Sequence, residues 1–150
     1  MASRHQRVEL TLDRLLQLEA MAARQAGQET PIQRFYASWT QAKDEPERII
    51  LADTRDPMLF RLPNHNGRLS PFWPSRQLKD FPCRDHALMC GVEYLQCLVT
   101  RQPAATYIRH VSDFADREYL RLLVPLDHNR LAYEIRALSG PNSLVPVEHA

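Results

Sequence analysis

Apolar and polar side chains alternate along the last third of the chain. The alternation runs through three consecutive stretches, 106–111, 119–126 and 131–138, and polar residues at 127–130 separate the second from the third. A period of two is typical of strands that cover a core with one face. We therefore predict a three-stranded antiparallel meander. Its predicted core positions are Leu120, Leu122, Val124, Tyr133 and Ile135.

Three other segments have the spacing and composition of helices. Residues 8–26 carry leucines at largely helical intervals together with several alanines. Thr30 followed by Pro31 is a typical start for a second, short helix. Residues 87–100 predict a third helix, although Gly91 weakens it by roughly 1 kcal/mol relative to alanine.

Short apolar stretches and prolines fill the middle of the chain. Two apolar stretches, 49–52 and 58–62, flank an Asp-Pro turn and predict a β-hairpin. Residues 63–86 are rich in proline and are predicted to be irregular, except for one short helix near 77–81. The order of these elements predicts an α+β fold.

Composition narrows the class of protein. The chain has 150 residues and is 44% hydrophobic, which is enough for one globular domain with a core. Its 19 basic and 18 acidic residues give a net charge of +1, whereas a dedicated nucleic-acid binder carries a basic surplus. No apolar run approaches the roughly 20 residues of a membrane-spanning helix, and no secretory signal is visible. We therefore expect no nucleic-acid partner and no membrane partner.

The three cysteines, Cys83, Cys90 and Cys97, suit a reducing compartment better than a disulfide framework. We expect a cytoplasmic protein with buried, reduced thiols. Cys90 and Cys97 lie about two helical turns apart, roughly 10.5 Å, so they cannot share one metal ion. Cys83 and His86 have a plausible ligand spacing, but a structural zinc site needs four ligands and no second pair is visible. We expect no metal site.

Five short stretches carry a resemblance to a known family. They are 34–39 (RFYASW), 50–53 (ILAD), 56–62 (DPMLFRL), 100–103 (TRQP) and 119–126 (YLRLLVPL). In wording and in order they resemble a bacterial PAS-domain family that is often found as small stand-alone proteins. The resemblance covers about residues 34–138.

This resemblance implies a fold and a division of the chain. A PAS-like domain is a five-stranded antiparallel sheet with helices on one face. It would occupy residues 30–140, with an N-terminal flanking helix at 1–29 and a C-terminal tail at 141–150. Residues 63–67 stand where the family has a Gly-rich segment, so we expect either a different wall for the ligand cavity or a closed cavity. Cys83 lacks the surrounding motif of flavin photosensors, so flavin photochemistry is not expected.

Catalysis has one candidate arrangement, a cysteine nucleophile with a histidine base. The residues that could form it are Cys83, Cys90, Cys97, His86 and His110. Such a pair needs contact in space and a third orienting group. No nucleophile elbow, phosphate-binding loop or zinc-protease motif occurs in the sequence, and the acidic residues stand in charged stretches typical of a solvated surface. We assign no catalytic residues; a small enzyme of unknown reaction is the least favoured alternative.

Aromatic side chains and one histidine are the candidates for a ligand pocket. The pocket candidates are Phe72, Trp73, Tyr94, Tyr107 and His110. Side chains of these types line apolar pockets, but they fill cores equally well. Some PAS domains hold haem through a histidine, so haem held by His86 or His110 is an option. The favoured interpretation is that these histidines are exposed and that no cofactor is bound.

The helix predicted at residues 8–26 has an apolar stripe that needs cover. Its own sheet or a second copy of the chain could supply it. In PAS proteins such flanking helices build dimers, so a homodimer through residues 8–26 is expected. The resemblance implies a sensory or regulatory module that binds a small ligand or a partner protein and signals in trans. The alternative is a ligand-free adaptor for protein–protein contact.

Overall fold

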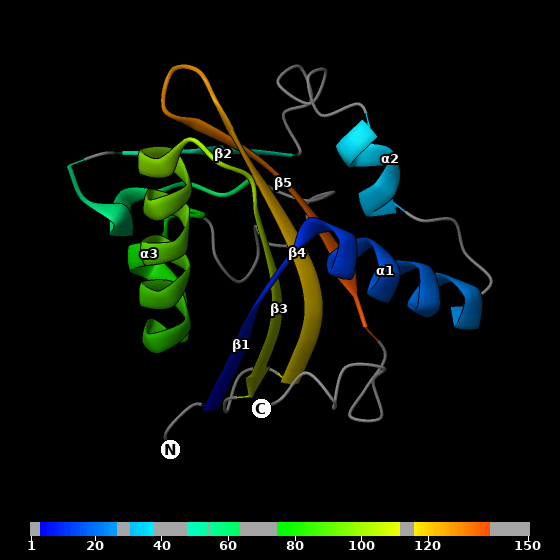
Figure 1. Cartoon of the computed structure of the whole chain (residues 1–150). Helices are drawn as coiled ribbons and strands as arrows, with labels where there is room; N and C mark the ends of the chain where they lie inside the picture. The colour runs from blue at the N-terminus through cyan, green and yellow to red at the C-terminus, as the bar shows by residue number, and fades with distance from the viewer. Residues whose placement is uncertain are drawn as a thin grey trace. The chain divides into compact units, whose positions relative to one another are not determined.

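A computed structural model describes residues 4–26, 31–37, 48–53, 55–63, 75–111 and 116–138 (Figure 1). These residues form a five-stranded antiparallel sheet with the strand order β1-β3-β4-β5-β2. The strands are β1 (Arg4–Leu10), β2 (Ile49–Leu51), β3 (Ala104–Val111), β4 (Asp116–Leu126) and β5 (Arg130–Ala137). The α-helices are α1 (Leu12–Ala26), α2 (Pro31–Ala37) and α3 (Arg84–Thr100), and two 3-10 helices are η3 (Pro57–Leu59) and η5 (Leu78–Asp80). The expected α+β class is confirmed.

Contacts along the chain define two compact units. The first unit comprises Met1–Ser38, Ala104–Leu122 and Glu134–Ala150. The second unit comprises Trp39–Pro103 and Leu123–Tyr133. Strands β4 and β5 therefore contribute residues to both units.

The predicted meander is confirmed, because β3, β4 and β5 are neighbours in the sheet. Of the predicted core positions, Leu120, Leu122, Val124 and Tyr133 are buried. The prediction for Ile135 is wrong, since this side chain is 36% exposed. The register explains the difference: β2 pairs with β5 only as far as Ala132, so Ile135 lies beyond the end of that pairing.

The start of the segment predicted as a helix is a strand. Residues 8–10 belong to β1, which pairs antiparallel with β3 from Arg4↔Val111 to Leu10↔Ala105. Helix α1 begins only after Thr11, whose Oγ1 accepts a hydrogen bond from the backbone N–H of Arg14 at 3.1 Å. The strand is favoured because its alternating side chains fit a ladder and β3 offers it a free edge.

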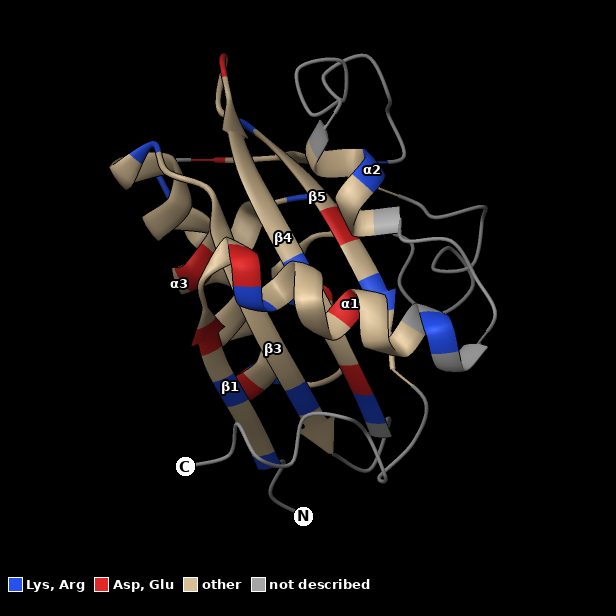
Figure 2. Ribbon diagram, turned by 45° about the vertical axis from the view of Figure 1, so that its right-hand side comes forward, with Lys and Arg blue, Asp and Glu red and all other residues tan. Residues whose placement is uncertain are grey.

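The apolar stripe of α1 is covered within the first unit. Leu15 and Leu18 are buried, and α1 contacts β3, β1 and α2 (Figure 2). Helix α2 adds Ile32 and Phe35 to the same apolar layer, and both are buried. The homodimer through residues 8–26 stays a prediction, but the need to cover these leucines no longer supports it.

The predicted β-hairpin forms only in part. Strand β2 is present, but residues 58–62 are joined to it by a single bridge, in which Arg61 and Leu51 exchange backbone hydrogen bonds of 2.9 Å. Pro57 begins η3 instead, and the Asp56 side chain caps it by accepting a hydrogen bond from the Met58 backbone N–H at 2.9 Å. Proline has no N–H to donate to a ladder but fits the first turn of a helix.

Helix α3 of the second unit confirms the prediction for residues 87–100 and begins slightly earlier. It contacts η3 and η5, and η5 falls within the short helix predicted near 77–81. A Cβ atom at Gly91 would lie 3.2 Å from the Cβ of Pro57. The close approach of η3 therefore explains a glycine in the middle of this helix. At its end, Arg101 donates from Nη1 to the carbonyl oxygen of Leu126 at 3.0 Å.

Two substitutions test the assignment of the core. Leu122→Ala should lower the free energy of unfolding by about 2–5 kcal/mol, because it leaves a cavity on the central strand. Ile135→Ala should lower it by less than about 1 kcal/mol, because that side chain already meets solvent. Urea denaturation measures both, and equal losses at the two positions would contradict the burial described above.

Candidate functional site

A buried carboxylate lies between β3 and β4 in the first unit. Glu118 on β4 is 6% exposed, and Tyr107 on β3 is fully buried. The hydroxyl of Tyr107 donates a hydrogen bond to Oε2 of Glu118 at 2.5 Å. Nη1 of Arg109, also on β3, lies 3.9 Å from the same oxygen. A phenol and a guanidinium therefore hold one side of this carboxylate.

The other oxygen of Glu118 is buried and unsatisfied. Among the described residues, Oε1 of Glu118 is buried and accepts no hydrogen bond. A carboxylate has about four acceptor positions, and leaving a buried acceptor unsatisfied costs roughly 1–3 kcal/mol. This arrangement is unfavourable for stability alone. It suits a group that accepts a hydrogen bond from an incoming donor.

Glu19 on α1 is the contrasting case in the same unit. It is also buried, but its two oxygens accept hydrogen bonds from the backbone N–H groups of Ile32 and Gln33, the latter at 2.9 Å. Burial raises the pKa of Glu19 above its ordinary value, and these hydrogen bonds, with Arg136 and Arg34, oppose the rise. Glu19 caps the N-terminus of α2, so its role is structural.

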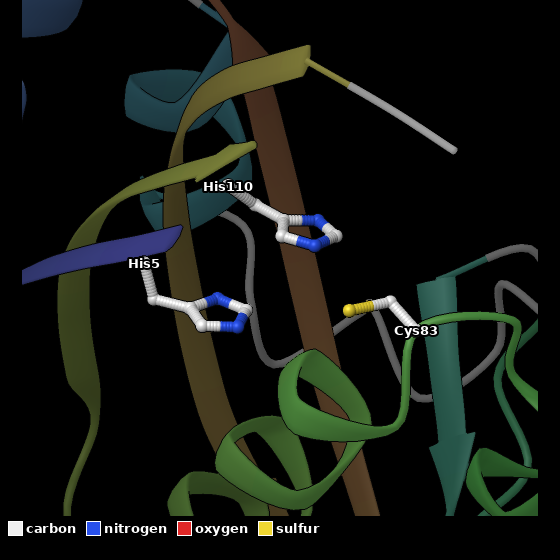
Figure 3. Close-up of side chains that lie close together, drawn as sticks. All are labelled: His5, Cys83 and His110. Carbon is white, nitrogen blue, oxygen red and sulfur yellow. The ribbon is translucent and has the colours of Figure 1, made fainter. Parts of the chain in front are cut away.

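A second group in the first unit consists of two histidines. His5 and His110 are register partners in the β1–β3 ladder. Their rings stack with centroids 4.8 Å apart and planes 5° from parallel (Figure 3). His110 is fully buried, and burial lowers its pKa to about 4, with smaller contributions from Arg117, His5 and Arg7. The ring of His110 is therefore neutral at pH 7.

The second unit contains one of the Cys–His pairs considered for catalysis. Sγ of Cys90 and Nε2 of His86 lie 3.6 Å apart on successive turns of α3. Both side chains are buried, and the ring of Phe81 lies 5.6 Å from that of His86. A substrate could reach this thiol only if the surrounding residues moved. The pair therefore fits a packed thiol better than a nucleophile.

The structure tests the expected burial of the histidines, the cysteines and Glu118. His86 and His110 are both buried, so the expectation of exposed histidines is wrong. The expectation of buried thiols is confirmed for Cys83, Cys90 and Cys97. Glu118 is buried although it stands in a charged stretch that indicated a solvated surface.

The pocket candidates do not form one described group. Phe72 and Trp73 lie outside the described residues. Tyr94 is buried in the second unit, where its ring stacks on Phe60 with centroids 6.3 Å apart. Tyr107 and His110 belong to the first unit and are buried on β3.

Sequence reasoning missed two residues of these groups. His5 was missed because nothing in the sequence links it to a distant histidine. Glu118 had a readable signal, because it continues the alternation of Leu120 and Leu122 by one more step on the same side of β4.

Comparison with protein-family models, with curated proteins and with solved structures finds no match to this chain. Among the described residues, no helix combines the length and the apolar character needed to cross a lipid bilayer. The function must therefore be argued from the site itself.

The buried histidine gives a prediction on acid stability. The unfolded chain binds a proton at this ring near pH 6.5, whereas the folded chain keeps His110 neutral down to about pH 4. Stability is therefore lost as the pH falls through this window, by about 3 kcal/mol in total. In His110→Gln this part of the loss should disappear.

The measurement is the free energy of unfolding in urea, taken in steps between pH 7 and about pH 4. His128→Asn is the matched control, because His128 is exposed in the turn between β4 and β5 and should leave the pH dependence unchanged. The same slope in His110→Gln as in the unaltered chain would show that His110 is not held neutral.

Proposed function

We propose that this chain is a PAS-type sensory or regulatory module that binds a small polar ligand at Glu118 and acts on another protein in trans. The order of elements supports the proposal: α3 precedes the β3–β4–β5 meander in a five-stranded antiparallel sheet. This is the order that the resemblance to PAS domains implies. The order of the elements supports the PAS-type architecture, and the site at Glu118 supports the binding of a ligand.

The observation that carries the proposal is the buried, unsatisfied oxygen of Glu118. Among the described residues its Oε1 accepts no hydrogen bond, while Oε2 is held by Tyr107 at 2.5 Å. Burying a carboxylate oxygen without a hydrogen bond costs stability, and an unsatisfied buried group of this kind calls for an explanation such as a ligand. A ligand that donates to Oε1 would recover the lost hydrogen bond.

The chemistry of the site limits the class of ligand. Oε1 of Glu118 calls for an N–H or O–H donor, and a charged donor would give the stronger bond. Arg109, whose side chain is 21% exposed, adds a positive charge beside it. A small molecule that carries a donor next to an anionic or carbonyl group would use both side chains.

Native mass spectrometry of the freshly purified chain tests this proposal. We expect a bound small mass on the unaltered chain and its loss in Glu118→Gln. The amide oxygen of Gln keeps the hydrogen bond from Tyr107, but its NH₂ group meets the incoming donor with a second donor. The change is nearly isosteric, so the fold should persist, which circular dichroism checks.

Glu19→Gln is the matched control, because it makes the same chemical change at a buried carboxylate whose two oxygens are already engaged. This variant should keep the bound mass. A bare protein in the native spectrum would favour the ligand-free adaptor. A mass retained equally in Glu118→Gln would show that the ligand binds elsewhere.

A further inference from the structure

The backbone of the first unit fixes His5 and His110 beside each other. In an antiparallel ladder, directly opposed residues project to the same face. His5 and His110 are opposed in the β1–β3 register, and the nearest ligand nitrogens of their rings lie within 4.8 Å of each other (Figure 3). Their proximity therefore follows from strand pairing and does not depend on a flexible loop.

The two rings have the chemistry of metal ligands. A neutral imidazole is the commonest metal ligand in proteins, and His110 is fully buried opposite His5 in the ladder. Metal–nitrogen bonds are about 2.0–2.1 Å long, so one ion can join nitrogens at most about 4.2 Å apart. The two rings are stacked and nearly parallel, and an imidazole nitrogen binds a metal ion in the plane of its ring. The half-buried His5 ring must therefore turn out of the stack to bind the same ion as His110.

The type of ligand atom selects against hard cations. Mg²⁺ and Ca²⁺ bind through oxygen ligands, above all carboxylates, whereas Zn²⁺, Cu²⁺ and Ni²⁺ form strong bonds to neutral nitrogen donors. A pair of nitrogen ligands therefore favours the second group of ions.

We propose that His5 and His110 form a binding site for a divalent transition-metal ion, which is held through their imidazole nitrogens. The site differs from the expectation drawn from the sequence, which considered the spacing of cysteines and did not include His5. It is also independent of the ligand proposed at Glu118. Cys83, which Figure 3 also draws, belongs to the second unit, and the two histidines carry this assignment alone.

Titration of the full chain with ZnCl₂ tests the site. The protein is first dialysed against EDTA, and binding is followed by calorimetry and by elemental analysis after gel filtration. We expect one ion per chain. His5→Asn and His110→Asn should each weaken binding by at least about tenfold. His128→Asn should leave it unchanged, because His128 lies in an exposed turn.

The two histidine variants distinguish a loss of zinc binding from a loss of folding. If His110→Asn fails to fold, His5→Asn decides, because His5 is only half buried on the edge strand. Equal zinc affinity in His5→Asn and in the unaltered chain would overturn the assignment. So would binding that is lost in Cys83→Ser or His128→Asn while both histidine variants keep it. These readouts do not involve Glu118, so this proposal and the proposed function can fail separately.

Discussion

The pairing of β1 with β3 is the interaction on which the rest of the first unit depends. Without β1, strand β3 would be an edge strand with unpaired backbone groups. The ladder from Arg4↔Val111 to Leu10↔Ala105 makes β3 an interior strand. Tyr107 and His110 on β3 are then fully buried, and α1, which follows β1 directly, is placed against the same strands. The candidate ligand site and the histidine pair both follow from this one pairing.

The two buried glutamates of this unit differ in whether their oxygens are hydrogen-bonded. Both oxygens of Glu19 accept hydrogen bonds from backbone N–H groups at the N-terminus of α2. These hydrogen bonds compensate for the burial of Glu19 and satisfy donors that the helix itself leaves unpaired. Glu118 has only Oε2 engaged, by Tyr107, and its Oε1 accepts no hydrogen bond among the described residues. A chain under selection for stability alone would have little reason to keep this second arrangement. The contrast supports a binding role for Glu118 without invoking any relative.

The elements with long, regular patterns of apolar residues could be predicted from the sequence. Strands β3, β4 and β5 and helix α3 were predicted because their periods continue over many residues. Strand β1 was missed because most of its residues are polar and it runs directly into the leucines of α1, although Thr11 marked the boundary. Arg61 was assigned to a strand, but the preceding Pro57 favoured a 3-10 turn, and Arg61 kept only one bridge to β2.

The sites were harder to predict than the fold. Glu118 could have been identified from its step in the alternation of β4, but the pairing of His5 with His110 depends on which strands meet. That choice is made by tertiary packing and leaves no local signal in the sequence. The aromatic pocket candidates show the same limit, because residue type indicates burial but does not say which buried groups lie together.

Hydrogen–deuterium exchange of the full chain, read by mass spectrometry on peptides that cover β1 and β3, tests the central claim most directly. If β1 pairs with β3 throughout the ladder, the amides of both strands should exchange slowly and together, as parts of one cooperative unit. Exchange in residues 4–10 at the rate of an unstructured chain, with β3 still protected, would contradict the account. In that case β1 would not close the sheet, and neither buried site would have the environment described above.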